Sequence, residues 1–83
     1  MRFTAAVTRE QGVTFTVLLV KSGVIASSNR ESVRTSAPSN LPRPIVLAEQ
    51  KSGGRMQYHG RTDIVKFLSN VPYQALPWKD YTV

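Results

Sequence analysis

The sequence contains no cysteine among its 83 residues, and His59 is its one histidine. Disulfide bonds, thiolate metal sites and thiol redox catalysis are therefore excluded. A metal site around His59 would need several carboxylates as further ligands, and the whole chain has only five acidic residues. We expect no metal ion and no cofactor. The lack of cysteine is compatible with a reducing compartment, and we expect a cytoplasmic protein.

Long hydrophobic runs are absent as well. The most apolar stretch, Val13–Val20, is far shorter than the about 20 residues that a helix needs to cross a bilayer. Arg9, Glu10 and Lys21 interrupt the apolar region that a secretory signal peptide requires. We therefore expect neither a membrane partner nor a leader sequence.

Acidic side chains are scarce, and their positions do not indicate a catalytic pair. Most of them lie at an expected turn or helix start, which leaves Glu49 and Asp80. The spacing of these two gives no reason to place them in one cleft, as a general acid and base would require. No Gly-x-Ser-x-Gly elbow is present, and Gly53-Gly54 is typical of a hairpin turn rather than a phosphate loop. We expect a protein that is not an enzyme, since catalysis would need a pocket that joins His59 to Glu49 or Asp80.

Alternating side chains predict a β-hairpin from Arg2 to Val20 that turns at Glu10-Gln11-Gly12. A three-residue loop would place Arg9 opposite Val13. One face of this hairpin would then carry Phe3, Ala5, Val7, Phe15, Val17 and Leu19, and the other Thr4, Ala6, Thr8, Thr14, Thr16 and Leu18. We expect the first face to be core and the second to be mostly solvated.

A short helix is predicted after this hairpin, because Ser28-Asn29-Arg30-Glu31 has the spacing of a capping box with Ser28 as the cap. Pro38 would end the helix, which offers only Val33 and Ala37 as apolar contacts. The segment Pro38–Pro44 contains three prolines and predicts a stiff, extended connection.

A second hairpin and a second helix follow. The sequence predicts strands over Ile45–Gln50 and Arg55–His59, joined by a four-residue loop, with a three-residue loop as the alternative. The longer loop would place Ile45, Leu47, Met56 and Tyr58 on one face, and Val46, Ala48, Gln57 and His59 on the other. A helix capped by Thr62 or Asp63 would then present Ile64, Phe67, Leu68 and Val71, and Pro72 would end it.

The stretch from Pro44 to Leu68 resembles the closing strand, hairpin and helix of thioredoxin-like domains. The similarity lies in Pro44–Leu47, Gly53-Gly54-Arg55, Tyr58-His59-Gly60 and Asp63–Leu68. The resemblance implies a proline before the strand that is often cis and lines an active site in that family. The Cys-x-x-Cys site of the family is missing here, so the resemblance implies a shared supersecondary shape and no function.

Together these patterns predict one α+β domain over residues 1–83, with the order ββαββα. We expect a mostly antiparallel sheet with both helices packed on one face. The tail, residues 72–83, carries too many large apolar side chains for a disordered segment. It should pack on the domain itself or on a partner subunit.

Two binding surfaces are predicted. A protein interface, either with a second copy or with another protein, would use the sheet edge and tail through Leu18, Val20, Tyr73, Leu76, Trp78 and Tyr81. Alternatively, the net charge of +6 favours a nucleic-acid partner or a regulatory role. Phosphate contacts would then come from Arg30, Arg34, Arg43, Arg55, His59 and Arg61. The basic residues are spread singly along the chain, so the non-enzymatic interaction module is the function that we expect first.

Overall fold

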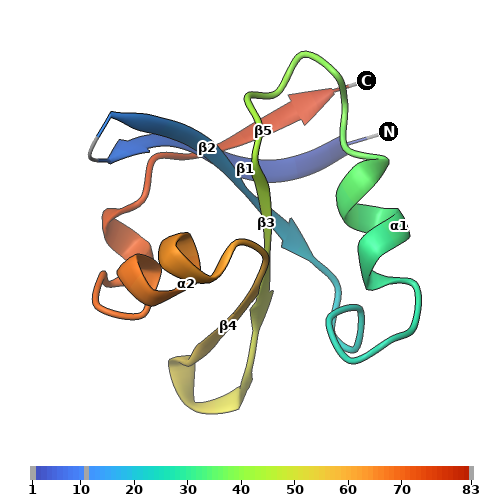
Figure 1. Ribbon diagram of the computed structural model, residues 1–83. Coiled ribbons are helices and arrows are strands. Elements are labelled where there is room, and N and C mark those ends of the chain that lie inside the picture. The colour runs from blue at the N-terminus through green and yellow to red at the C-terminus, as the bar shows by residue number, and fades with distance from the viewer. Residues whose placement is uncertain (1, 11, 83) are drawn as a thin grey trace.

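The computed structural model describes residues 2–10 and 12–82, which form one five-stranded sheet flanked by helices (Figure 1). In chain order the elements are β1 (Arg2–Glu10), β2 (Val13–Val20), α1 (Arg30–Thr35), β3 (Ile45–Gln50), the 3-10 turn η1 (Ser52–Gly54), β4 (Met56–His59), α2 (Thr62–Leu68), the 3-10 turn η2 (Tyr73–Ala75) and β5 (Trp78–Thr82). The strands lie in the order β4-β3-β2-β1-β5. Only β2 and β3 are parallel, so the α+β class and the mostly antiparallel sheet are confirmed.

The order ββαββα is wrong by one element, because the tail forms a fifth strand. β5 runs antiparallel to β1, with Tyr81 opposite Phe3 and Lys79 opposite Ala5. The rings of Phe3 and Tyr81 stack with their centroids 5.3 Å apart. The pairing satisfies backbone groups on the side of β1 that β2 leaves free. The tail therefore packs on its own chain.

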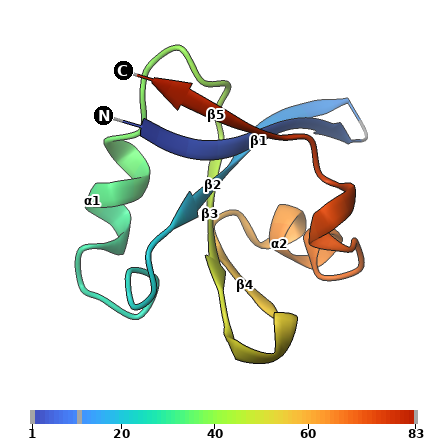
Figure 2. The same cartoon turned by 180° about the vertical axis from the view of Figure 1, so that it is seen from behind.

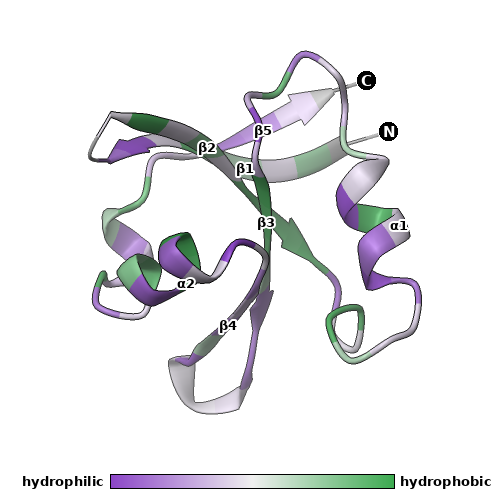
Figure 3. Ribbon diagram, viewed as in Figure 1, coloured by the Kyte–Doolittle hydropathy of each residue, from purple (hydrophilic) through white to green (hydrophobic). Residues whose placement is uncertain are grey.

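The two helices cover opposite faces of the sheet, and the expectation that both lie on one face is wrong (Figures 1 and 2). The core on the α2 side consists of Ala6, Phe15, Val17, Val46, Ala48, Ile64, Leu68 and Leu76. The core on the α1 side consists of Ala5, Leu18, Ile25, Ala37, Leu41, Ile45 and Leu47. Uninterrupted apolar runs therefore occupy Val17–Val20 of β2 and Ile45–Ala48 of β3 (Figure 3), as expected for strands that are buried on both faces.

Burial on both faces also explains why the predicted register of the first hairpin is wrong. Glu10 pairs directly with Val13, so one residue fewer separates the strands than expected; the central turn residue, Gln11, lies outside the described residues. As a result, Phe15 packs on the α2 side with Ala6, while Phe3 and Ala5 face α1. Alternation fixes a register only where one face is wet, and β2 has buried side chains on both.

The second hairpin is also shifted by one residue. Gln50 pairs with Met56, which leaves a five-residue connection, so neither the four-residue nor the three-residue loop is correct. Gly53 and Gly54 both have positive φ, of 77° and 75°, a conformation that glycine adopts without steric cost. Met56 consequently lies on the face of Ala48, and β4 begins one residue later than predicted.

Both helices begin without the predicted side-chain caps. The N-cap of α1 is Asn29 rather than Ser28, and the N-cap of α2 is Arg61 rather than Thr62 or Asp63; neither makes a side-chain capping hydrogen bond. Each helix ends before the proline that was expected to end it. In the described part of the chain, no helix has the length and apolar character needed to cross a membrane.

The connection between α1 and β3 lies over the α1 side of the sheet. Leu41 is buried there, and Thr16 Oγ1 donates a hydrogen bond to the Pro42 carbonyl oxygen at 2.7 Å. The Arg43–Pro44 peptide bond is cis. This connection and α1 therefore cover the same face of the sheet together.

Gly60 allows the chain to pass closely over β3 between β4 and α2. A Cβ atom at this position would lie 3.0 Å from Val46 Cγ2 and 3.2 Å from the Ile45 carbonyl oxygen. We expect Gly60→Ala to lower the free energy of unfolding by about 1–3 kcal/mol, because the backbone of β3 would have to shift. Urea unfolding of the variant beside the wild type checks this, and equal midpoints would contradict the close approach.

Candidate functional site

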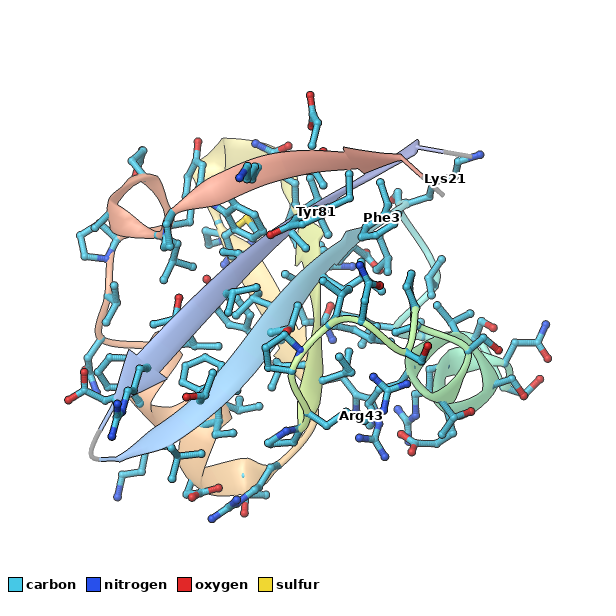
Figure 4. All side chains as sticks on the ribbon, turned by 90° about the horizontal axis from the view of Figure 1, so that it is seen from above. Phe3, Lys21, Arg43 and Tyr81 are labelled. Carbon is cyan, nitrogen blue, oxygen red and sulfur yellow. The ribbon has the colours of Figure 1, made fainter. Side chains whose placement is uncertain are left out.

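A groove lies between α1 and the sheet, and its walls are mainly apolar. We call it the α1 groove; its apolar lining is Phe3 of β1, Leu18 of β2, Val33 of α1, and Ala37 and Pro38 after α1. Asn29, Ser32 and Ser36 form its polar border along the helix. The volume of about 690 Å³ is in the range of ligand and peptide sites in proteins. Figure 4 shows Phe3 and Tyr81 next to each other at the β1–β5 margin.

The lengths of the elements explain why this face stays open. A helix of six residues is about 9 Å long, whereas β1 and β2 have nine and eight residues and extend about 25–30 Å. α1 contacts mainly β3. The residues that α1 places along the groove include Ser32 and Ser36, whose side chains are small. Apolar surface of β1 and β2 therefore remains accessible beside the helix.

The six residues predicted for a protein interface do not form one surface. Leu18 and Leu76 are buried in the two cores, at 7% and 6% exposure. Trp78 packs against the α2-side core, and its Nε1 donates to the Tyr73 carbonyl oxygen at 2.7 Å. Val20 and Tyr81 are half-buried against the α1-side core. Of the set, only Leu18 lines the α1 groove, with Tyr81 stacked beside its Phe3 wall.

Sequence reasoning missed most of the groove. Phe3 was assigned to the core, while Val33 and Ala37 were seen only as helix contacts. One signal was present in the sequence: a helix with two apolar residues and several serines cannot cover a sheet that is apolar on both sides. This mismatch between helix and sheet can be recognised only when the second face of the sheet is known to be apolar.

The six residues predicted for nucleic-acid contact are brought together only in part. Arg34, His59 and Arg61 line a second hollow, of about 410 Å³, with Glu31 and Pro44. Arg30 donates to the Ile25 carbonyl oxygen and Arg43 to the Ala37 carbonyl oxygen. Arg55 directly follows η1 and is not among the residues that line this hollow.

Carboxylates already neutralise much of the positive charge around this second hollow. Glu31 accepts hydrogen bonds from Arg34, at 2.7 Å and 3.1 Å, and its second carboxylate oxygen is hydrogen-bonded with His59 Nε2. Arg34 and then His59 hold the pKa of the Glu31 carboxyl at about 2. Arg61 is paired with Asp63 at 2.8 Å. The predicted basic stripe is therefore interrupted by acidic partners.

Glu49 is a fully buried carboxylate on β3. Its Oε1 accepts a hydrogen bond from the Ile25 backbone N–H at 3.2 Å, and its Oε2 lies 2.5 Å from Lys51 Nζ. The Lys51 ammonium and the backbone N–H groups of Gly23 and Ile25 hold the Glu49 pKa below its ordinary value, although burial acts in the opposite direction. Glu49 therefore fastens the loop after β2 to the end of β3.

Glu49 and Asp80, the two carboxylates that the sequence left without a structural role, do not line the hollow at His59, where the carboxylate in contact with His59 is that of Glu31. His59 lies on β4 and Asp80 on β5, at opposite edges of the sheet. Within residues 2–10 and 12–82, no three His, Asp or Glu side chains are grouped in a way that could hold a metal ion.

Comparison with known proteins does not assign a family. No family model, no curated protein and no solved structure matches the chain. The functional argument therefore depends on the geometry of the chain itself.

Proposed function

We propose that this domain is a non-enzymatic interaction module that binds a segment of another protein in the α1 groove. The observation that carries the proposal is the apolar lining of that groove, in which Phe3, Val33 and Pro38 are only partly covered. Partly covered apolar surface next to a helix suits a partner segment that inserts large apolar side chains. The burial of such side chains supplies most of the binding free energy in interfaces of this kind.

The edge of the sheet supports the same proposal. β5 is an edge strand, and its outer side is open to pairing with an extended segment. The stacked Phe3 and Tyr81 rings connect this edge to the groove. A partner could therefore anchor side chains in the groove while its backbone continues along β5.

A second copy of the chain fits this edge less well. A two-fold axis perpendicular to the sheet pairs antiparallel strands so that residues on the same face are opposite each other. An axis through the middle of β5 would place Lys79 opposite Lys79, or Asp80 opposite Asp80. Like charges directly opposite each other destabilise strand pairing, and the net charge of +6 on each copy adds repulsion.

A peptide-display selection against the wild-type domain tests the proposal, with a groove-filling variant as the probe of position. Ser32→Trp places a large side chain at the border of the groove, whereas Thr35→Trp places it on an exposed part of α1 outside the lining. We expect selected peptides to bind Ser32→Trp at least about tenfold more weakly, and Thr35→Trp with unchanged affinity. Equal affinity for both variants and the wild type would show that the groove is not the site.

A further inference from the structure

We infer that the partner segment in the α1 groove is acidic as well as apolar. This inference rests on the proposed function and adds the chemical class of the partner. It follows from the distribution of charge between the two faces of the sheet.

Three of the carboxylates lie on the α2 side. Glu10 lines a hollow with Phe15 and Ile64 on that side. Asp80 is opposite Thr4, whose Oγ1 donates to it at 2.7 Å, and both residues alternate with residues that face α1. Asp63 belongs to α2 itself. Three of the five acidic residues of the chain are therefore turned away from the α1 groove.

The two carboxylates on the α1 side are already occupied. Glu31 is engaged by Arg34 and His59. Glu49 is fully buried beneath Lys51. Neither presents a free negative charge to a ligand in the α1 groove.

Exposed cations remain on the α1 side. Lys79 is opposite Ala5 on β5, and Arg9 lies on the same face of β1 as Ala5. Lys21 follows β2 directly, and Arg43 lies in the connection that covers this face. In Figure 4, Lys21 projects on the side where Phe3 and Tyr81 lie, and Arg43 is seen across from them. No ion pair joins Lys21 or Lys79 to a carboxylate in the described part of the chain.

A protein segment fits these observations better than a nucleic acid. The groove is apolar, with Leu18, Val33 and Ala37 among its lining residues, whereas a phosphate backbone needs a row of cations that it can follow. The exposed cations on this face are separate from one another and lie outside the apolar lining, and they suit acidic side chains that flank apolar anchors. Complementary charge of this kind also speeds association and selects between partners.

Three synthetic peptide pools of equal length test the inference. All share the same apolar anchor positions, and the intervening positions are acidic in one pool, uncharged in the second and basic in the third. We expect the acidic pool to bind about tenfold more tightly than the uncharged pool at low salt, with most of the difference lost at high salt. Lys21→Glu and Lys79→Glu should each weaken acidic-pool binding about fivefold, while Arg55→Glu, far from the groove, should not change it.

The possible outcomes distinguish the acidic character of the partner from the proposal that the α1 groove binds a protein segment. Equal binding of the acidic and uncharged pools, blocked in both cases by Ser32→Trp, overturns the acidic partner and leaves the interaction module standing. Failure of all three pools to bind overturns both. Binding of a mixed-sequence single-stranded oligonucleotide at the same salt, weakened by Lys21→Glu, overturns the protein partner in favour of a nucleic acid.

Discussion

Glu49→Gln is expected to lower the midpoint of thermal unfolding at neutral pH by on the order of 10 °C. The amide oxygen can still accept a hydrogen bond from the Ile25 N–H, but the amide NH₂ group would face the Lys51 ammonium as a second donor. Lys51 would lose its partner, and the loop after β2 would lose part of its attachment to β3. Circular dichroism melting curves at pH 7 measure the effect. Glu10→Gln makes the same chemical change on β1 and should leave the midpoint nearly unchanged.

The same substitution should flatten the dependence of stability on pH. The pKa of Glu49 is lower in the folded state than its ordinary value of 4.5, so its ionised form stabilises the fold above that pH. As the pH falls below about 4.5 and through the folded-state pKa, this contribution is lost. Wild type should therefore lose more stability than Glu49→Gln between pH 6 and pH 3. Glu31, with a pKa of about 2, should add acid sensitivity that both proteins share. Identical slopes in the two proteins would contradict the role assigned to Glu49.

Trp78→Ala is expected to lower the free energy of unfolding by about 3 kcal/mol and to leave the oligomeric state unchanged. Trp78 packs against the α2-side core of its own chain and donates a hydrogen bond to the Tyr73 carbonyl oxygen. Truncation removes both contacts and loosens the start of β5. Urea unfolding measures the loss, and light scattering at the same concentration measures the mass. Gln74→Ala, at an exposed position of η2, is the matched control and should change neither.

A different result would show that the tail packs on a partner subunit rather than on its own chain. If Trp78→Ala converted a dimer to a monomer without a loss of monomer stability, the tail would act between subunits. The Phe3–Tyr81 stack and the β1–β5 pairing would then form between chains rather than within one.

Local patterns in the sequence were sufficient to locate most elements. Ile45–Gln50 was predicted with correct bounds because a short apolar run ends at a glycine turn. A helix that presents Ile64, Phe67, Leu68 and Val71 was predicted from their spacing; the observed helix begins at Thr62 and ends at Leu68, before Val71, and Ile64 and Leu68 are buried. Signals of this kind depend only on neighbours in the chain.

Registers and faces were not predictable in the same way. Phe15 and Phe3 are both apolar at alternating positions, yet they lie on opposite faces. When both faces of a strand are buried, a shift by one residue costs little apolar burial, and the turn decides the register. The fifth strand was missed because β5 gains its stability from pairing with β1, more than 70 residues away along the chain.

The candidate site was predicted only in its general character. The predicted interaction surface comprised Leu18, Val20, Tyr73, Leu76, Trp78 and Tyr81. Of these only Leu18 lines the α1 groove, and Tyr81 stacks on Phe3 beside it. Its other walls come from α1 and from the connection after it. The position of these walls relative to the sheet depends on which face α1 covers. The sequence of α1 alone does not indicate that face.

Chemical-shift mapping of the ¹⁵N-labelled domain locates the binding surface residue by residue. On addition of the acidic peptide pool, the amide signals of Phe3, Leu18, Val33 and Ala37 should shift in a saturable manner, and Ser32→Trp should abolish these shifts while Thr35→Trp does not. Shifts confined to the second hollow around His59 and Arg61, or no saturable shift with any pool, would contradict binding in the α1 groove.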